Sequence, residues 1–250
     1  MMKVIIVTQA RVGSTRLPGK VLKEIDGVSI LGIHLRRIKK ATCHSLITVA
    51  TTHEDGVGKI VSVANEESVQ VFQGDVNDVL KRFYESVKEA MPDYIVRVTS
   101  DCPLIDASVI DECVNLCISK QADYICSSES FPDGLDVEVF PFRLLREANE
   151  KAAKNYEREH VTPWIREYAK SQGTYFEHTC NTLYTNVRMT VDEQSDFESI
   201  QQLVKIFGIS ERWVVYADYI LNNPDFFLNQ HIKRNEGLLK SSNEENSKIL

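Results

Sequence analysis

The chain has 250 residues and a mass of 28.5 kDa, and its 36 acidic side chains exceed its 29 Lys and Arg side chains, giving a formal net charge of −7. This acidic balance argues against a nucleic-acid-binding protein, because affinity for DNA or RNA backbones requires a net basic face. No apolar run approaches the roughly 18–20 residues that cross a bilayer, and the short apolar start runs directly into polar residues. We therefore expect a cytoplasmic globular protein that binds neither nucleic acid nor a membrane.

Strand-like and helical patterns alternate through the first half of the chain. The uninterrupted β-rich run Lys3–Thr8 is typical of a strand buried on both faces, and Ile30–Ala41 has apolar side chains at helical spacing. Further strands are predicted at Leu46–Thr51, Val69–Phe72, Tyr94–Thr99 and Asp123–Ser127, and further helices at Val57–Glu66, Asp78–Ala90 and Ser108–Ser119. This order predicts an α/β protein with a mainly parallel sheet that is covered by helices on both sides.

The second half of the chain is less regular. No internal repeat or Pro/Ser-rich linker divides the sequence, so residues 1–240 are expected to form one domain, and the polar end, residues 241–250, a flexible tail. The patterns predict a strand at Arg188–Val191 and helices at Phe142–Lys154, from Thr162-Pro163 onward with Thr162 as N-cap, at Ser195–Phe207 with Ser195 as N-cap, and at Ser210–Asn222.

A glycine-containing basic loop, Thr8–Lys20, follows the first predicted strand. Glycine lets the backbone approach a ligand closely, so that consecutive N–H groups can point at anionic oxygens. Arg11, Arg16 and Lys20 add full positive charges, and ligands of parallel sheets bind beyond the carboxyl ends of the strands. The loop therefore suits a polyphosphate, and the alternative is a solvated basic loop whose glycines serve turns.

Two standard phosphate-binding motifs do not fit this loop. A Walker A loop has four residues between its glycines and a Ser or Thr after its Lys, whereas five residues separate Gly13 from Gly19 and Val21 follows Lys20. The G-x-G-x-x-G pattern of dinucleotide-binding proteins is also absent. A polyphosphate at this loop would be bound in another way.

Two aspartates follow predicted strands that are far apart in the sequence. Asp101 comes just after Tyr94–Thr99, and Asp192 ends the run Arg188–Asp192. A magnesium ion bound to substrate phosphates takes one or two protein carboxylates and keeps several waters, a requirement that this pair meets. For either aspartate the alternative is an N-cap of the following helix. Asp106 and Asp196 are better explained as caps or first-turn charges.

Several segments, taken together and in order, resemble the cytidylyltransferases that make CMP-activated sugars. The match is to the spore-coat polysaccharide biosynthesis branch, which is related to the CMP-KDO and CMP-sialic acid synthetases. The resemblance covers nearly the whole chain. Any one segment is weak evidence for the family, whereas the set of segments in this order is specific. The segments are Gln9–Lys20, Asp78–Phe83, Arg97–Ile105, Asp133–Val139, Arg158–Pro163, Arg188–Asp192 and Arg234–Gly237.

The resemblance implies a three-layer α/β/α sandwich, the Rossmann-like nucleotidyltransferase fold, with a mixed and mostly parallel sheet. It implies transfer of CMP from CTP to a small-molecule acceptor, an acidic or other sugar, with release of pyrophosphate and with Mg²⁺ as cofactor. It also implies a role in surface polysaccharide or glycan biosynthesis, and a homodimer, since the related synthetases often dimerise.

The resemblance also assigns roles to residues. For the acceptor residues a structural role is the alternative. Asp133, Asp136 and Glu138 also suit an acidic hairpin turn, and a lone histidine is more often structural. The expected residues are Ala10, Arg11, Gly13, Ser14, Lys20, Thr99 and Ser100 for the nucleotide; Asp101 and Asp192 for the metal; Lys20, Arg16 and Asp101 for catalysis; and Asp133, Asp136, Glu138, Arg158 and His160 for the acceptor.

Two other hypotheses stay open at the level of sequence. The chain could transfer another nucleotide, or use a phosphate or phosphonate acceptor, since spacing alone does not fix the base. It could also be a nucleotide-binding relative that has lost turnover. The presence of Lys20, Asp101 and Asp192 speaks against loss of turnover, because a degenerate relative would be expected to lack one of them.

Overall fold

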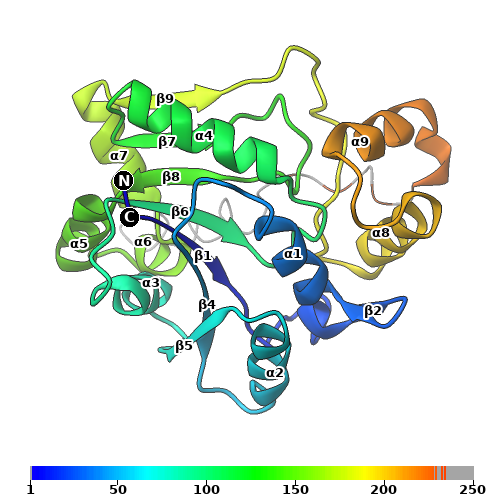
Figure 1. Cartoon of the computed structure of the whole chain (residues 1–250), viewed down its shortest axis with the longest axis horizontal. Coiled ribbons are helices and arrows are strands. Elements are labelled where there is room, and N and C mark those ends of the chain that lie inside the picture. Colours follow the sequence, from blue (N-terminus) through cyan, green and yellow to red (C-terminus); the bar gives the residue numbers. More distant parts are fainter. Residues whose placement is uncertain (1, 228, 230–231, 233, 235–250) are drawn as a thin grey trace, which may run out of the picture.

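The computed structural model describes residues 2–227, 229, 232 and 234, so the predicted tail 241–250 and the quoted residues 235–237 lie outside the described part. Its central element is a seven-stranded sheet with the strand order β5-β4-β1-β6-β8-β7-β9 (Figure 1). The strands are β1 (Val4–Gln9), β4 (Leu46–Thr52), β5 (Gln70–Gly74), β6 (Tyr94–Thr99), β7 (Tyr124–Ser127), β8 (Glu138–Pro141) and β9 (Tyr175–His178).

The sheet is mixed and mostly parallel, as the resemblance implied. Strands β5, β4, β1 and β6 run parallel to one another, and β9 runs parallel to β7. Strand β8 is inserted antiparallel between β6 and β7. The five strands predicted between Lys3 and Ser127 are all present, as β1, β4, β5, β6 and β7, whereas β9 was not predicted.

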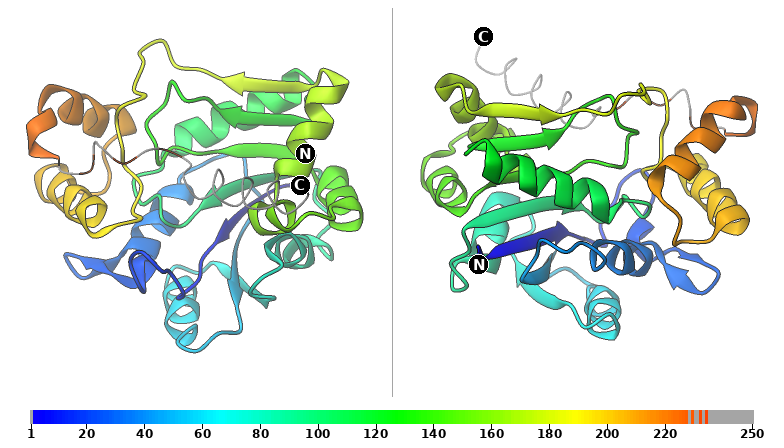
Figure 2. Two further views of the ribbon diagram at one scale, coloured as in Figure 1. Left: turned by 180° about the vertical axis from the view of Figure 1, so that it is seen from behind. Right: turned by 45° about the horizontal axis from the view of Figure 1, so that its top comes forward.

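Helices cover both faces of the sheet, which gives the three-layer sandwich (Figure 2). Strand β1 shows why both faces are covered, because Val4 and Ile6 point into one apolar core and Ile5 and Val7 into the other. The first core is closed by α1 (Ile30–Ile38), α2 (Gly58–Glu66), α4 (Ala107–Ser119), α8 (Gln194–Phe207) and α9 (Trp213–Asn222), and the second by α3 (Val79–Val87), α5 (Phe142–Lys151) and α7 (Pro163–Gln172).

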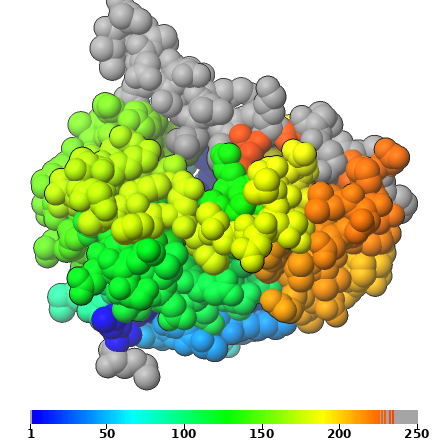
Figure 3. All heavy atoms as spheres, turned by 90° about the horizontal axis from the view of Figure 1, so that it is seen from above, coloured from blue at the N-terminus to red at the C-terminus, as the bar shows by residue number. Residues whose placement is uncertain are grey.

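Helices α8 and α9 lie at one end of the molecule. Figure 3 shows the yellow chain around residues 175–190 crossing one surface toward these orange helices.

None of the helices in the described ranges combines the length and the apolar character needed to span a membrane.

A small hairpin, β2 (Glu24–Ile25) with β3 (Val28–Ser29), was missed by the sequence analysis. Its two turn residues, Asp26 and Gly27, both have positive φ, at 50° and 76°. This Asp-Gly pair is the sequence signal of a two-residue hairpin turn. The strands escaped prediction because two residues are too few to show an alternating pattern.

The predicted strand Arg188–Val191 is wrong. Within it Arg188 forms only an isolated bridge with Asp133, and the other backbone groups bond to loops. The N–H of Met189 donates to the carbonyl of Asp133 over 2.7 Å, and that of Val191 to the carbonyl of Asp101 over 2.8 Å. The segment is extended and buried like a strand, but it joins two loops instead of pairing in the sheet.

Several helix boundaries also differ from the prediction. The predicted helix Phe142–Lys154 ends at Lys151 as α5, and a short helix that was not predicted, α6 (Asn155–His160), follows it. The carboxylate of Glu157 starts α6 by accepting the N–H groups of Ala153 and Lys154 at 3.1 Å each. Helix α9 begins at Trp213, three residues later than predicted. Helix α8 begins at Gln194 with Glu193 as its N-cap. Ser195 is therefore a first-turn residue and not the predicted cap.

A buried histidine joins the carboxyl ends of β1 and β6. The Nδ1 of His34 lies 2.9 Å from the carbonyl oxygen of Cys102, and its Nε2 lies 3.0 Å from Oγ1 of Thr8. Burial lowers the pKa of His34 to about 4, so the ring is neutral. Since a carbonyl only accepts, Nδ1 carries the proton and Nε2 accepts from the Thr8 hydroxyl. The loops that follow the two strands are thereby held together.

The turn containing Gly134 packs directly on the segment that contains Met189. Gly134 has a φ of +104°, and a Cβ built on it would lie 2.7 Å from the carbonyl carbon of Met189 and 2.9 Å from its oxygen. Both neighbours are backbone atoms and cannot give way. This position therefore requires glycine for two reasons: its positive φ and the close approach of two segments of the backbone.

We expect Gly134→Ala to lower the free energy of unfolding by roughly 2–5 kcal/mol, because backbone strain and overpacking add. Gly173→Ala is the matched control, since Gly173 has a φ of +69° with nothing within 4 Å of a built Cβ. That control should lose only the left-handed cost of about 1–2 kcal/mol. Urea denaturation of both variants measures the difference, and equal losses would contradict the packing argument.

Candidate active site

Two adjoining cavities, here called the cleft, lie beyond the carboxyl ends of β1 and β6. The smaller has a volume of about 290 Å³ and the larger about 500 Å³. They are continuous because they share lining residues from the ends of both strands and from the loops around them. The shared residues are Gln9, Arg16, Thr99, Asp101, His160 and Asp192.

The smaller cavity gathers the residues that the sequence analysis assigned to the nucleotide and the metal. They come from the loop after β1, from the end of β6 and from the segment before α8. All nine of these residues line it, together with Arg16 from the catalytic set; the nine are Ala10, Arg11, Gly13, Ser14, Lys20, Thr99, Ser100, Asp101 and Asp192.

An ion cluster lies where the two cavities meet. The Nζ of Lys20 is 2.7 Å from Oδ2 of Asp101 and 2.7 Å from Oδ1 of Asp192, and a terminal nitrogen of Arg16 is 3.1 Å from the same Asp192 oxygen. Burial alone would raise the pKa of Asp101, but the ammonium of Lys20 outweighs it and lowers that pKa to about 2. Burial opposes the charge on Lys20, yet the two carboxylates raise its pKa above the ordinary value. Lys20 and Asp101 are therefore both charged.

Neither aspartate caps a helix, which removes the alternative left open by the sequence. Helix α4 is capped by Asp106, whose carboxylate accepts the N–H of Ser108 at 2.9 Å, and α8 is capped by Glu193. Asp196 serves the first turn of α8 by accepting the N–H groups of Asp192 and Glu193 at 2.9 and 3.0 Å. Asp101 and Asp192 are left to face the cleft.

The two carboxylates fit a magnesium ion that arrives with substrate phosphates. They converge on one cation, the ammonium of Lys20, which shows that their oxygens can face a single positive ion. Residues 2–227, 229, 232 and 234 contain no cluster of three or more His, Cys, Asp or Glu that could hold a metal alone. Oxygen ligands from one or two carboxylates, completed by phosphates and water, are the usual environment of such an ion.

The backbone of the basic loop differs from the prediction. The N–H groups of Val12 and Gly13, which were expected to point at an anionic ligand, donate to Oε1 of Glu54 at 2.6 and 2.8 Å. Glu54 follows β4 and does not line either cavity. These two donors are already bonded to the protein's own carboxylate, and the cleft side of the loop is formed by other groups.

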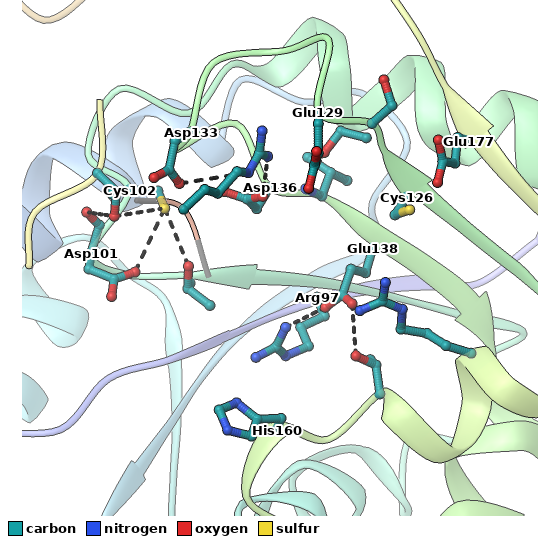
Figure 4. A pocket seen from close by; sticks show the side chains of 18 of the residues that line it. Arg97, Asp101, Cys102, Cys126, Glu129, Asp133, Asp136, Glu138, His160 and Glu177 are labelled. Carbon is teal, nitrogen blue, oxygen red and sulfur yellow. Dashed lines mark hydrogen bonds and ion pairs between the residues drawn. The ribbon is translucent and has the colours of Figure 1, made fainter. Parts of the chain in front are cut away.

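The larger cavity contains three of the predicted acceptor residues in ion pairs. Glu138 is bonded to the guanidinium of Arg97 and the hydroxyl of Tyr124, and it accepts from Oγ1 of Thr162 at 2.7 Å (Figure 4). Burial opposes the charge of Glu138, but Arg97 outweighs it and lowers the pKa of this carboxyl. Its oxygens therefore organise the wall, and Thr162, at the predicted N-cap position, uses its hydroxyl for this purpose.

The turn after Pro132 forms another part of the same wall. Asp133 lies 2.5 Å from Arg188, and Asp136 lies 2.5 Å from Arg234. Burial, together with the charge of Asp136, raises the pKa of Asp133 to about 6 in spite of the two arginines. His160 lines both cavities, and burial lowers its pKa.

Arg158 does not belong to the cleft. It lines neither cavity, and its guanidinium contacts both carboxylate oxygens of Asp78, at 2.6 and 3.0 Å, and the carbonyl of Asn149 at 2.8 Å. The cation that sequence reasoning placed beside an acceptor instead joins α6 to the start of α3. The prediction failed because Asp78, 80 residues away in the sequence, captures the side chain.

Five arginines line the cleft without having been predicted, and they are Arg82, Arg97, Arg166, Arg188 and Arg234. Four of them stand inside the quoted sequence segments, which was the available signal. Arg166 lies outside every segment, one turn into α7. Its guanidinium lies 6.0 Å from the ring centre of Tyr124 and makes no hydrogen bond or ion pair with the part of the chain that the structure describes.

Comparison with known proteins agrees with this fold. The model of the cytidylyltransferase family matches residues 4–231. The uncharacterized protein MJ1063 of Methanocaldococcus jannaschii is 37% identical over 227 residues, which are 89% of this chain and 92% of that protein. The spore coat polysaccharide biosynthesis protein SpsF of Bacillus subtilis is 28% identical over 235 residues, which are 90% of this chain and 97% of SpsF.

Solved structures give the same answer. A cytidylyltransferase from Leptospira borgpetersenii has a TM-score of 0.86 and 33% identity, with 94% of this chain and 100% of that chain covered. A CMP:2-keto-3-deoxy-manno-octonic acid synthetase complexed with CTP has a TM-score of 0.61 and 16% identity, with 82% and 99% covered, and shares the fold. The family match and the fold define a nucleotidyltransferase. Within that class, the chain belongs to the cytidylyltransferase family.

The contact of Glu54 with the basic loop can be tested by substitution. We expect Glu54→Ala to raise the dissociation constant for CTP roughly 10-fold or more, because two charge-assisted bonds that shape the loop are lost. Glu54→Gln keeps an acceptor oxygen and should recover most of the affinity. Asp55→Ala, at an exposed neighbour, is the control. Calorimetric titration measures all three, and unchanged CTP affinity in Glu54→Ala would disprove the role of Glu54 in shaping the loop.

Proposed function

We propose that this cytidylyltransferase transfers CMP from CTP to an acidic sugar and releases pyrophosphate, with Mg²⁺ held by Asp101 and Asp192. The observation that carries the proposal is the convergence of Lys20, Asp101 and Asp192 at the junction of the two cavities. One cavity is lined by the basic loop and suits a triphosphate, and the other is large enough for a sugar.

In this proposal the nucleotide occupies the smaller cavity. Arg11, Arg16 and Lys20 would neutralise the triphosphate, and Gly13 and Ser14 would line its path. Thr99 falls where related synthetases place a residue near the base, often a glutamine. A synthetase that shares the fold was solved in complex with CTP, which supports CTP as the nucleotide.

The proposed reaction is an in-line displacement at the α-phosphorus. An acceptor hydroxyl oxygen forms the new bond to phosphorus, the bond to the pyrophosphate breaks, and the hydroxyl proton is released. Lys20, with Arg11 and Arg16, stabilises the charge that grows on the leaving pyrophosphate. The chemistry that Mg²⁺ supplies when bound is polarisation of the α-phosphate and promotion of proton loss from the hydroxyl.

An acidic acceptor is supported by the charges of the larger cavity. Arg97, Arg188 and Arg234 are each paired with carboxylates there, whereas the half-buried guanidinium of Arg166 has no such partner among the described residues. An unpaired guanidinium at a cavity wall is suited to bind a carboxylate through two hydrogen bonds. The similarity to SpsF supports a product for surface polysaccharide biosynthesis.

Pyrophosphate release from CTP, UTP, ATP and GTP, over a panel of acidic and neutral sugars and phosphate or phosphonate acceptors, tests the proposal. We expect turnover with CTP and an acidic sugar only. Preference for another nucleotide or acceptor would favour the alternative transferase, and no turnover with any pair would favour a binding protein.

Asp101→Asn should lower Mg²⁺-dependent turnover roughly 100-fold or more with the fold intact, and retained activity would refute the metal assignment.

A second prediction concerns the acceptor. Arg166→Met should raise the KM for an acidic acceptor roughly 30-fold, because a bidentate charge pair is lost, and it should leave the KM for CTP unchanged. Lys170→Met, one turn later on the same helix and exposed, is the control. Steady-state kinetics measure both variants. An equal change in the two KM values would show that Arg166 is structural.

Three further expectations stay predictions: the homodimer, the cytoplasmic location and the single domain over residues 1–240. We carry them with the proposed function. Size-exclusion chromatography with light scattering measures the first directly.

A further inference from the structure

The ammonium of Lys20 occupies the position at which the two carboxylates converge. Each contact is 2.7 Å long, and the side chains of Lys20, Asp101 and Asp192 are only 14%, 25% and 21% exposed. The two facing carboxylate oxygens are therefore no farther apart than the sum of these two contacts. Without a cation between them, two carboxylates at such a distance repel strongly in a site with little water.

The second oxygen of each carboxylate points toward another group. Oδ2 of Asp192 accepts from Arg188 at 3.2 Å, and Oδ1 of Asp101 lies 3.7 Å from the thiol of Cys102, as Figure 4 shows for the latter pair. The oxygens that face Lys20 are the pair that already converges on a single cation, and a metal ion held by this pair takes the place of the ammonium. The ammonium and the metal cannot occupy that position together.

We propose that Lys20 is an internal counter-ion, which holds Asp101 and Asp192 together in the nucleotide-free protein and is exchanged for the divalent metal when CTP binds. The proposal rests on the proposed function, since it takes the same two carboxylates as the metal ligands. It adds that the lysine opposes the metal until the nucleotide is present.

The reason for this coupling is electrostatic. A displaced Lys20 in the empty cleft would leave its two ion-pair partners for water, while the buried site accepted a dication. When a triphosphate lies on the basic loop, the displaced ammonium gains a new anionic partner within the same cavity. The nucleotide therefore removes the cost of displacing the lysine, so metal and nucleotide favour each other's binding.

Titration of Mn²⁺ into the nucleotide-free protein, followed by electron paramagnetic resonance, tests this inference without turnover. We expect Lys20→Met to bind Mn²⁺ at least about 10-fold more tightly than the natural chain, because the competing ammonium is gone. Lys23→Met is the matched control, since Lys23 lies 4.9 Å from the ring of Phe197 and pairs with no carboxylate of the described residues. Equal or weaker Mn²⁺ binding by Lys20→Met would overturn the proposal.

Thermal unfolding provides a second readout. The Lys20→Met protein should melt at a lower temperature than the natural chain, and Mn²⁺ alone should restore most of the loss while it moves the natural chain little. If Lys20→Met does not fold, Lys20→Gln, whose amide still donates to one carboxylate, should show the same gain in Mn²⁺ affinity. The lack of a gain in that variant would also overturn the proposal.

The two proposals fail separately. Turnover of CTP by the natural chain, with no gain in Mn²⁺ affinity on removal of the lysine, would refute the counter-ion role alone. A gain in Mn²⁺ affinity, with no turnover of any nucleotide, would refute the proposed function and leave the exchange intact.

Discussion

The parallel pairing of β1 with β6 is the constraint on which the cleft depends. In this register Gln9 lies opposite Thr99, so the basic loop and the loop that carries Asp101 leave the sheet side by side. The neutral ring of His34 then ties the two strand ends together from below. Because neither loop can shift without breaking these bonds, an otherwise exposed loop presents its charges at fixed positions.

The sequence allowed this part to be predicted because the signals are local. Continuous apolar runs are typical of buried parallel strands. Because ligands bind beyond the carboxyl ends of such strands, two segments far apart in the sequence are predicted to lie side by side. Lys20 and Asp101 could therefore be placed in one site. Asp192 could also be placed there, although the strand expected before it does not exist, because a buried extended segment reaches the same edge.

The failures concern contacts that no local pattern records. Arg188–Val191 has the buried, extended character of a strand, but only the fold decides whether its backbone meets another strand or two loops. Glu54 accepts hydrogen bonds from backbone N–H groups 41 and 42 residues away, and no motif around it in the sequence predicts this contact. The sequence around Arg158 suits an anion, because a helix start follows it. In the structure Asp78, at the start of another helix, neutralises the Arg158 guanidinium.

The charges of the cleft explain how an acidic protein can receive anions. Arg188 contacts three carboxylates, those of Asp133, Asp192 and Asp196, and so connects the wall of the larger cavity with the ion cluster. Such buried cations are neutralised by their partners and serve mainly to fix the geometry. The cations that keep no partner add a net attraction for a ligand.

Two lining cations lack an ion pair or hydrogen bond through their guanidinium groups within the ranges that the structure describes, and each belongs to a different cavity. Arg11 lines the smaller cavity and Arg166 the larger. A cleft with one unpaired cation in each half is suited to two anionic substrates. Asp101 and Asp192 line both halves, so a cation exchanged between them acts at the place where the two anions must meet. Joining two anions requires positive charge at that point, and the exchange supplies a dication there only when the nucleotide is present to retain the displaced lysine.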